Sequence, residues 1–275
     1  MVTQKVKTLL LKLLGVRAVS ALHAVRFITM LSSRQHTDPE FKLLGTLLGK
    51  GDIAIDVGAH SANWTYRLHK AVGPGGLVYA FEADPYSARV TGLAIKLLGL
   101  KGVTLFPFGL SEREEEVPMR VANDEGTRLA AITHVDRSAA ATDRGVELIR
   151  LKTLDSLVNE HPALLKTALI KCDVEGYELF VFRGAGRVLD EARPFVILEV
   201  GMFENQGYTA SDVNEFFRAK SYQAFALTDP SHLTPTDGKL EVDRALSVNR
   251  LLVPTEKLGV VESWLPEKAG LPLRA

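Results

Sequence analysis

The chain has 275 residues, enough for one large α/β domain with an appendage or for two small domains. Hydrophobic residues at 46%, charged residues at 24% and a mean hydropathy of +0.07 exclude wholesale disorder, a collagen-like repeat and a polytopic membrane protein. The single cysteine, Cys172, can form neither an internal disulfide nor a multi-cysteine metal site. A reducing compartment such as the cytoplasm is therefore the expected location.

The zero net charge hides an asymmetry along the chain. Residues 1–36 contain six basic residues and no acid, so this segment carries +6. Residues 37–275 contain 27 basic and 33 acidic residues and carry −6. A domain of that charge does not attract a nucleic-acid backbone, and we expect no nucleic-acid partner.

The basic segment 1–36 is leucine-rich, but its charges leave no apolar run long enough to cross a bilayer. At helical spacing, basic residues share one side and apolar residues another: Lys5, Lys12 and Arg26 against Val2, Val6, Leu10, Leu13 and Ile28. Three interpretations stay open: a helix that packs on its own domain or on a second copy in a homodimer, a peripheral membrane contact, or a cleaved targeting segment.

From residue 37 to residue 275 the pattern predicts one α/β domain, because short apolar runs alternate with helical stretches. The expected fold is a seven-stranded, mostly parallel Rossmann-like sheet with helices on both faces. The predicted strands are Ile53–Val57, Leu77–Phe81, Val103–Phe108, Ala168–Asp173, Phe195–Val200, Ala224–Leu227 and Leu246–Val253. The predicted helices are Trp64–Val72, Pro85–Leu98, Glu178–Leu189 and Ser211–Ala219.

An insert at about residues 111–151 breaks this alternation. It is charged and has no strong helical period. Two alternating stretches, Glu116–Val121 and Val146–Leu151, predict a peripheral hairpin. Long insertions of this kind often cover active sites, so we expect the insert to lie near the functional site.

Carboxylates lie at or just beyond the ends of four predicted strands: Asp56, Glu82, Asp173 with Glu175, and Glu199. Ligands of open α/β sheets bind at the carboxyl ends of the strands, so these acids predict a site at that edge. A dinucleotide-binding turn would need glycine at positions 58, 60 and 63, and the chain has Gly58, His60 and Asn63. A nucleoside without phosphates fits better, and S-adenosylmethionine, whose sulfonium is cationic, meets that description.

Six strings resemble, in order, the motifs of FkbM-type S-adenosylmethionine-dependent methyltransferases: IDVGAHSANWT, VYAFEADP, FPFGLSEREEEV, LKTLDSL, IKCDVEGYELFVFRGA and PFVILEV. The resemblance covers roughly residues 51–201. It implies the class I methyltransferase fold and a small-molecule hydroxyl substrate, because most family members O-methylate sugars, polyketides or related compounds. This chain has His60 where the family usually has asparagine, and Ala62 where it has glycine.

The resemblance also implies roles for individual residues. A methionine-side turn would comprise Asp56, Gly58, Ala59 and His60. Glu82 would bind the ribose, and the adenine would lie between Ala83 and the Gly109–Leu110 turn. Asp173 would face the methyl donor or the acceptor.

Methyl transfer to an alcohol gains from a base that removes the hydroxyl proton. Glu175 and Glu199 are the favoured candidates, with Asp173, His60 and His134 as further possibilities. Glu175 could instead be an acid that stabilises a helix N-terminus. His134 is expected to be exposed and Cys172 to be a packing residue.

No histidine spacing indicates a metal site, although acids gathered in one crevice could hold magnesium. Two other classes of function stay open. One is a nicotinamide-dependent oxidoreductase on a similar fold, and the other is a non-catalytic version of the fold that docks on a membrane or protein.

Overall fold

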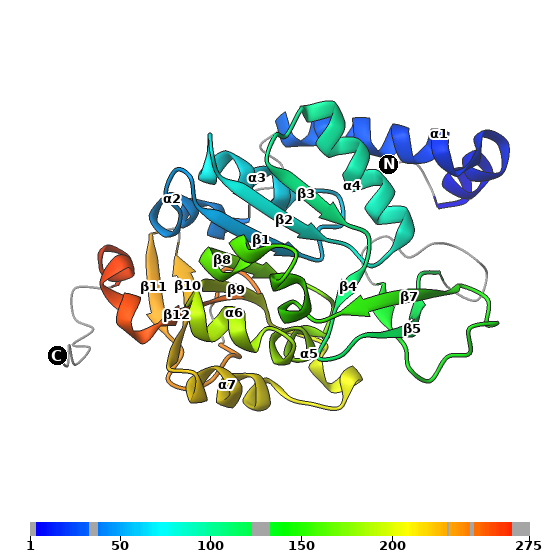
Figure 1. Cartoon of the computed structure of the whole chain (residues 1–275). Helices are drawn as coiled ribbons and strands as arrows, with labels where there is room; N and C mark the ends of the chain where they lie inside the picture. Colours follow the sequence, from blue (N-terminus) through cyan, green and yellow to red (C-terminus); the bar gives the residue numbers. More distant parts are fainter. Residues whose placement is uncertain (1–3, 33–37, 123–132, 230, 243–244, 266–275) are drawn as a thin grey trace.

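The computed structural model describes residues 4–32, 38–122, 133–229, 231–242 and 245–265. A central eight-stranded sheet has the order β11-β10-β12-β9-β8-β1-β2-β3 (Figure 1). Its strands are β1 (Ile53–Val57), β2 (Leu77–Phe81), β3 (Val103–Phe106), β8 (Thr167–Cys172), β9 (Phe195–Glu199), β10 (Tyr222–Asp229), β11 (His232–Pro235) and β12 (Asn249–Pro254). The five strands β9, β8, β1, β2 and β3 run parallel to one another. The pairings of β12 with β9, of β10 with β12 and of β11 with β10 are antiparallel.

The predicted α/β class is confirmed, but the expectation of a seven-stranded, mostly parallel sheet needs correction. The bounds predicted for β1 and β2 are confirmed, and the other predicted strands shift by a few residues at one or both ends. The prediction missed β11, an edge strand of four residues with an exposed histidine, because it has no apolar run. The sheet is mixed because β12 runs antiparallel between β9 and β10.

Helices cover both faces of the sheet, as predicted (Figure 1). The α-helices besides the first are α2 (Leu44–Leu47), α3 (Asn63–Val72), α4 (Pro85–Leu98), α5 (Glu178–Arg183), α6 (Gly186–Glu191) and α7 (Ala210–Ala219). Short 3₁₀ segments lie at Pro39–Lys42, Asp155–Val158, Pro162–Lys166, Phe203–Gln206 and Thr255–Trp264. The helix expected over residues 178–189 is two helices, because at Gly184 the chain approaches the Ser111 carbonyl so closely that a Cβ would lie 1.9 Å from its oxygen.

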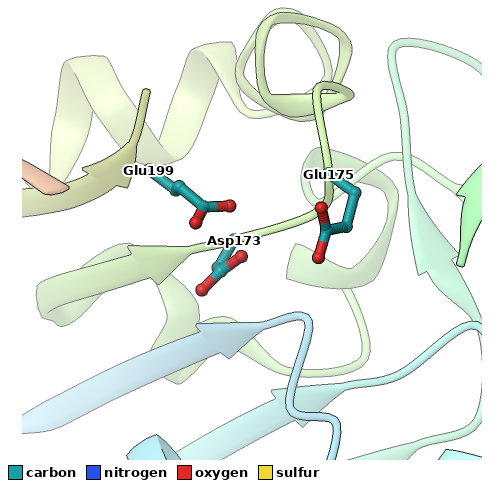
Figure 2. A group of neighbouring side chains, drawn as sticks. All are labelled: Asp173, Glu175 and Glu199. Atoms are coloured by element: carbon teal, nitrogen blue, oxygen red, sulfur yellow. The ribbon is translucent and has the colours of Figure 1, made fainter. Parts of the chain in front are cut away.

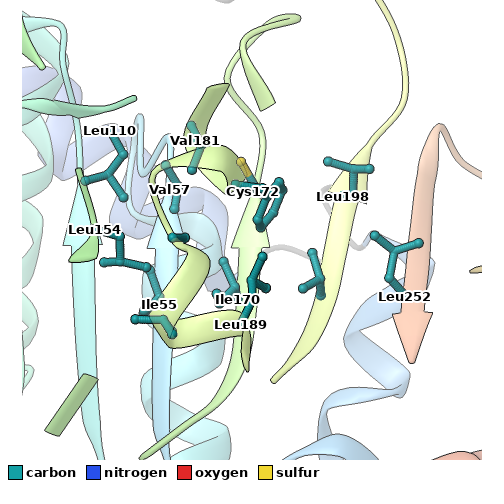
Figure 3. Packing of buried hydrophobic residues seen from close by; sticks show 14 of the residues in the cluster. Ile55, Val57, Leu110, Leu154, Ile170, Cys172, Val181, Leu189, Leu198 and Leu252 are labelled. Carbon is teal, nitrogen blue, oxygen red and sulfur yellow. The ribbon is translucent and has the colours of Figure 1, made fainter. Parts of the chain in front are cut away.

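Alternate residues of each strand enter opposite cores. Ile55 and Val57 of β1 pack in the cluster shown in Figure 3, together with side chains from β8, α5 and α6. Ala54, which precedes Ile55, packs on the other face with Trp64 and Leu68 of α3. This two-residue period assigns each residue near a strand end to one face of the sheet.

The insert forms a second sheet of order β4-β7-β5-β6. Its strands are β4 (Gly109–Leu110), β5 (Glu115–Arg120), β6 (His134–Val135) and β7 (Val146–Lys152). The predicted hairpin is confirmed, since β5 and β7 pair antiparallel. A small core that includes Met119, Ile149 and Tyr177 joins this sheet to the loop after β8.

Helix α1 (Gln4–Ser32) contains a break at Gly15, where φ is 75° and ψ is 162°. The helical period expected to run from Lys5 to Arg26 is interrupted at Gly15, which lies between Lys12 and Arg26. Beyond Gly15, α1 packs on α4 with Val19 and Ala24 buried, and His23 Nδ1 lies 2.6 Å from the Tyr86 hydroxyl. Among the described residues, no helix combines the length and apolarity needed to cross a membrane.

The buried pair Asp56 and Thr65 joins β1 to α3. Thr65 Oγ1 donates to Asp56 Oδ2 at 2.5 Å, and both residues are almost completely buried. We expect Thr65→Val to destabilise the protein by about 1–3 kcal/mol, because it leaves a buried carboxylate oxygen without its donor. Urea denaturation measures the free energy of unfolding. The exposed strand residue Thr104 provides the matched control, and an equal effect of Thr104→Val would contradict the prediction.

Candidate functional site

The turn after β1 has a backbone that few side chains tolerate. Gly58, His60 and Ala62 all have positive φ, of 86°, 43° and 70°. A Cβ at Gly58 would lie 1.9 Å from the Asp173 carbonyl oxygen, so only glycine lets this turn approach the end of β8. Ala62 occupies the left-handed conformation that the family's usual glycine adopts freely, so the turn keeps its shape at some cost in strain.

Glu82, which follows β2, holds this turn. Its Oε2 accepts from the His60 backbone N–H at 2.7 Å, and its Oε1 accepts from the Asp84 N–H at 2.8 Å. Burial raises the pKa of Glu82 to about 7, although the two backbone donors oppose that shift. The carboxylate therefore ties the ends of β1 and β2 together while it faces a cavity.

The cavity has a volume of about 440 Å³, within the range of small-molecule sites. It opens at the carboxyl ends of the strands, between the central sheet and the insert. Nine of the eleven predicted site residues line it: Gly58, His60, Glu82, Ala83, Gly109, Leu110, Asp173, Glu175 and Glu199. These predicted residues come from five separate segments of the chain, and the fold brings them together around one cavity.

Asp56 and Ala59, predicted to contact the cofactor, do not line this cavity. Asp56 lies on the face of β1 that packs on α3, where it accepts from Thr65. It is also the register partner of the buried Lys171 on the adjacent parallel strand β8. In this position Asp56 is better placed to balance the charge of Lys171 than to contact a ligand in the cavity.

Three carboxyl groups meet on one wall of the cavity. Asp173, Glu175 and Glu199 each offer an oxygen within 4.8 Å of the others (Figure 2). Asp173 and Glu199 share a hydrogen bond. Beneath them, the Lys171 ammonium lies 3.3 Å from Asp173 Oδ2 and donates to Asn249 Oδ1 at 2.7 Å.

These neighbours separate the pKa values of the cluster. Burial alone would raise the pKa of Asp173, but Lys171 and the bond with Glu199 outweigh it and hold that pKa below its ordinary value. Burial, followed by the contact with Asp173, raises the pKa of Glu199 to about 9. Burial and the charge of Asp173 raise the pKa of Glu175 to about 7. At neutral pH, Asp173 is ionised and Glu199 is protonated.

The loop after Asp173 places Glu175 in the cavity wall. Glu175 and Gly176 have φ of 55° and 91°, and a Cβ at Gly176 would lie 2.4 Å from the Met202 carbonyl oxygen. Glu178 Oε1 accepts from the Val174 and Gly176 N–H groups at 2.9 and 3.3 Å. Helix α5 begins at Glu178, so Glu175 lies before the helix, where this fixed loop holds it at the cavity wall.

The oxygen spacing of Asp173, Glu175 and Glu199 is compatible with a hard cation. In this structure, however, the Lys171 ammonium, 3.3 Å from Asp173 Oδ2, already compensates the charge of Asp173. The cluster alone therefore does not define a metal centre.

The insert supplies further cavity residues. Met119, Thr133, Val135, Ile149 and Leu151 line the cavity without having been predicted, as does Tyr177 from the loop after β8, and His134, named above as a possible base, lines it too. His134 was expected to be exposed, but it lies on β6 at the cavity wall, a correction that follows from the pairing of β6 with β5. The lid-like position of the insert was predictable, whereas its individual contacts depend on strand pairing.

Cys172 behaves as predicted. It is fully buried at the end of β8, and burial raises the pKa of its thiol well above the ordinary value. It packs among apolar side chains (Figure 3).

The shifted pKa of Glu199 predicts a pH-dependent stability. The folded protein keeps the Glu199 proton up to about pH 9, whereas the ordinary pKa of a glutamate is 4.5. The free energy of unfolding therefore has its full contribution from Glu199 below pH 4.5 and loses it as the pH rises toward 9. Glu199→Gln keeps a hydrogen-bond donor for Asp173 and removes the titration. We expect the difference in melting temperature, variant minus parent, to increase as the pH rises from about 5 to about 9. Parallel pH profiles of the two proteins, or the same trend in a variant of the exposed Glu204, Glu204→Gln, would contradict the assignment.

Several solved structures resemble this one at low identity. Methyltransferase FkbM from Methylobacillus flagellatus KT is 14% identical with a TM-score of 0.48, and the match covers 88% of this chain and 59% of that one. A SAM dependent methyltransferase from Aquifex aeolicus is 15% identical with a TM-score of 0.40, over 69% and 82% of the two chains. A protein from Streptococcus mutans solved in complex with SAH is 12% identical with a TM-score of 0.44, over 79% and 97%.

The chain thus spans 59% of the length of the Methylobacillus protein. No curated protein matches the sequence. A family model described as the methyltransferase FkbM domain matches residues 56–224, which include the turn after β1, Glu82 and the carboxyl cluster. The chain belongs to the FkbM methyltransferase family.

Proposed function

We propose that this protein is an S-adenosylmethionine-dependent methyltransferase that methylates a hydroxyl group of a sugar, a polyketide or a related small molecule. Family membership supports methyl transfer. The observation that carries the cofactor assignment is the Glu82 carboxylate, which faces a cavity of suitable size at the carboxyl end of β2.

The hydrogen-bond capacity of Glu82 fits a ribose diol. An ionised carboxylate has about four acceptor positions, and backbone N–H groups of His60 and Asp84 occupy two of them. The two positions that remain match two neighbouring hydroxyl donors. His60 and Asn63 stand where a pyrophosphate-binding turn needs glycine, so we do not pursue the nicotinamide alternative.

The far side of the cavity suits a planar base. Ala83, Gly109 and Leu110 line it, and a Cβ at Gly109 would lie 3.1 Å from the Ala83 Cβ and 2.6 Å from Leu151 Cδ2. The backbone of Gly109 therefore forms the wall itself. These residues would hold the adenine, and the carboxyl cluster would favour the cationic end of the same molecule.

When bound, S-adenosylmethionine supplies a methyl group on a positively charged sulfur. The protein's own residues must then align the acceptor and remove its proton. Glu175 is the residue best suited to accept that proton on a carboxylate oxygen, because a general base works best with a pKa near the working pH. Glu199, whose pKa is about 9, already holds a proton at neutral pH and would orient Asp173.

Removal of the Glu82 carboxylate tests the cofactor assignment. We expect Glu82→Ala to weaken S-adenosylmethionine binding by at least about tenfold, measured by calorimetry, because two charge-assisted hydrogen bonds are lost. Binding to the parent protein should strengthen as the pH rises through about 7, where Glu82 ionises, and this trend should disappear in Glu82→Gln. The exposed Glu116 supplies the control variant Glu116→Ala. Unchanged affinity in a Glu82→Ala protein that melts like the parent would overturn the assignment.

A comparison of Glu175→Gln with Glu199→Gln tests the base. We expect Glu175→Gln to lower kcat by about 10²-fold or more with cofactor affinity retained, and to remove the limb of the pH profile near 7. Glu199→Gln should have a smaller effect, since the parent side chain is already protonated. Turnover is measured by S-adenosylhomocysteine release across a panel of hydroxyl compounds. A larger loss in Glu199→Gln would reverse the assignment.

A further inference from the structure

Helix α1 turns an apolar face away from the molecule. Beyond Gly15, Val19, Ser20 and Ala24 are buried on the side that packs on α4. The opposite side carries Leu22 and Val25, which are 52% and 51% exposed. Figure 1 shows α1 on the outer side of α4, away from the central sheet. Two large apolar side chains in adjacent turns of an outermost helix form a surface that favours a partner.

A basic residue adjoins this apolar face. Arg26 is exposed and follows Leu22 by four residues, so the two lie on the same side of the helix, while the exposed Arg17 adds positive charge on another side. The whole segment 1–36 carries +6 without a single acid, while residues 37–275 carry −6. The N-terminal segment that includes α1 thus combines an excess of positive charge with two exposed apolar side chains.

We propose that α1 docks this protein on an anionic lipid surface. A helix that combines exposed apolar side chains with basic residues can bury the former at the headgroup boundary while the latter contact anionic lipid. A symmetric dimer through the same face would bring two segments of +6 together, which electrostatic repulsion opposes. A nucleic acid would engage the arginines but would leave Leu22 and Val25 in water.

Docking through α1 would also fix the catalytic domain relative to the lipid. His23 of α1 lies 2.6 Å from the hydroxyl of Tyr86, which lies in the first turn of α4. The residues just before that turn, Glu82 and Ala83, line the cavity. The docked helix therefore contacts the element that begins at the cavity edge.

Vesicle co-sedimentation of the full chain tests the proposal. We expect binding to vesicles of equal parts phosphatidylcholine and phosphatidylglycerol, and little binding to phosphatidylcholine alone. Arg17→Gln with Arg26→Gln should weaken partitioning by about 30-fold, and high salt should have a similar effect. Leu22→Ser with Val25→Ser should weaken it by about tenfold or more.

Matched controls use residues of similar exposure on the insert. Leu148 of β7 is 53% exposed, and Arg144 and Arg150 are exposed as well. Leu148→Ser, and Arg144→Gln with Arg150→Gln, should leave vesicle binding within about twofold of the parent. Equal losses in these controls, equal binding to both vesicle types, or no vesicle binding would overturn the proposal. Analytical ultracentrifugation measures the oligomeric state. If Leu22→Ser with Val25→Ser changes that state and leaves vesicle binding intact, the partner of the exposed α1 face is a second copy of this chain, and the proposal is wrong.

Discussion

The crowding of carboxyl groups at one edge of the sheet is the constraint on which the site depends. Strands β9, β8, β1 and β2 are adjacent, and the acids at or just beyond the carboxyl ends of β9, β8 and β2 line one partly buried cavity. Burial disfavours their charged forms, so Glu82, Glu175 and Glu199 all have raised pKa values. A cation entering the cavity would relieve this penalty, so the proposed cofactor, with its charged sulfur, should be favoured over a neutral ligand of the same shape.

Lys171 prevents the crowding from neutralising every acid. It is fully buried on β8, next to Asp56 in register and 3.3 Å from Asp173, with its ammonium 5.3 Å from the centre of the Trp64 ring. A buried ammonium needs anionic partners: Asp173 pairs with it directly, and Asp56 lies beside it on the neighbouring strand. Lys171 thereby lowers the pKa of Asp173, while burial and the neighbouring Asp173 raise the pKa values of Glu175 and Glu199. The three carboxyl groups differ because only Asp173 contacts this lysine directly.

The sequence predicted the parts of this site that local chemistry determines. Strand β1, the glycine turn and Glu82 were recognisable because a short apolar run, a glycine and an acid follow one another in a fixed order. Long-range pairing was not predictable in the same way. The antiparallel insertion of β12 and the position of His134 at the cavity wall depend on which distant strand each segment pairs with. No local sequence pattern indicates those pairings. Asp56 was misplaced because a strand end can point to either face of the sheet, and only the packing of α3 decides which.

Charge segregation along the chain links the acidic cavity to the basic helix. An acidic domain is repelled by an anionic membrane, so a protein with net −6 over residues 37–275 would not approach one in a random orientation. In the docking proposed above, the +6 of residues 1–36 would turn this repulsion into an orienting force, because only the face that carries α1 would be attracted. The same acids that favour a cationic ligand inside the cavity would then hold the remainder of the domain away from the lipid. One distribution of charge would thus serve ligand binding and orientation together.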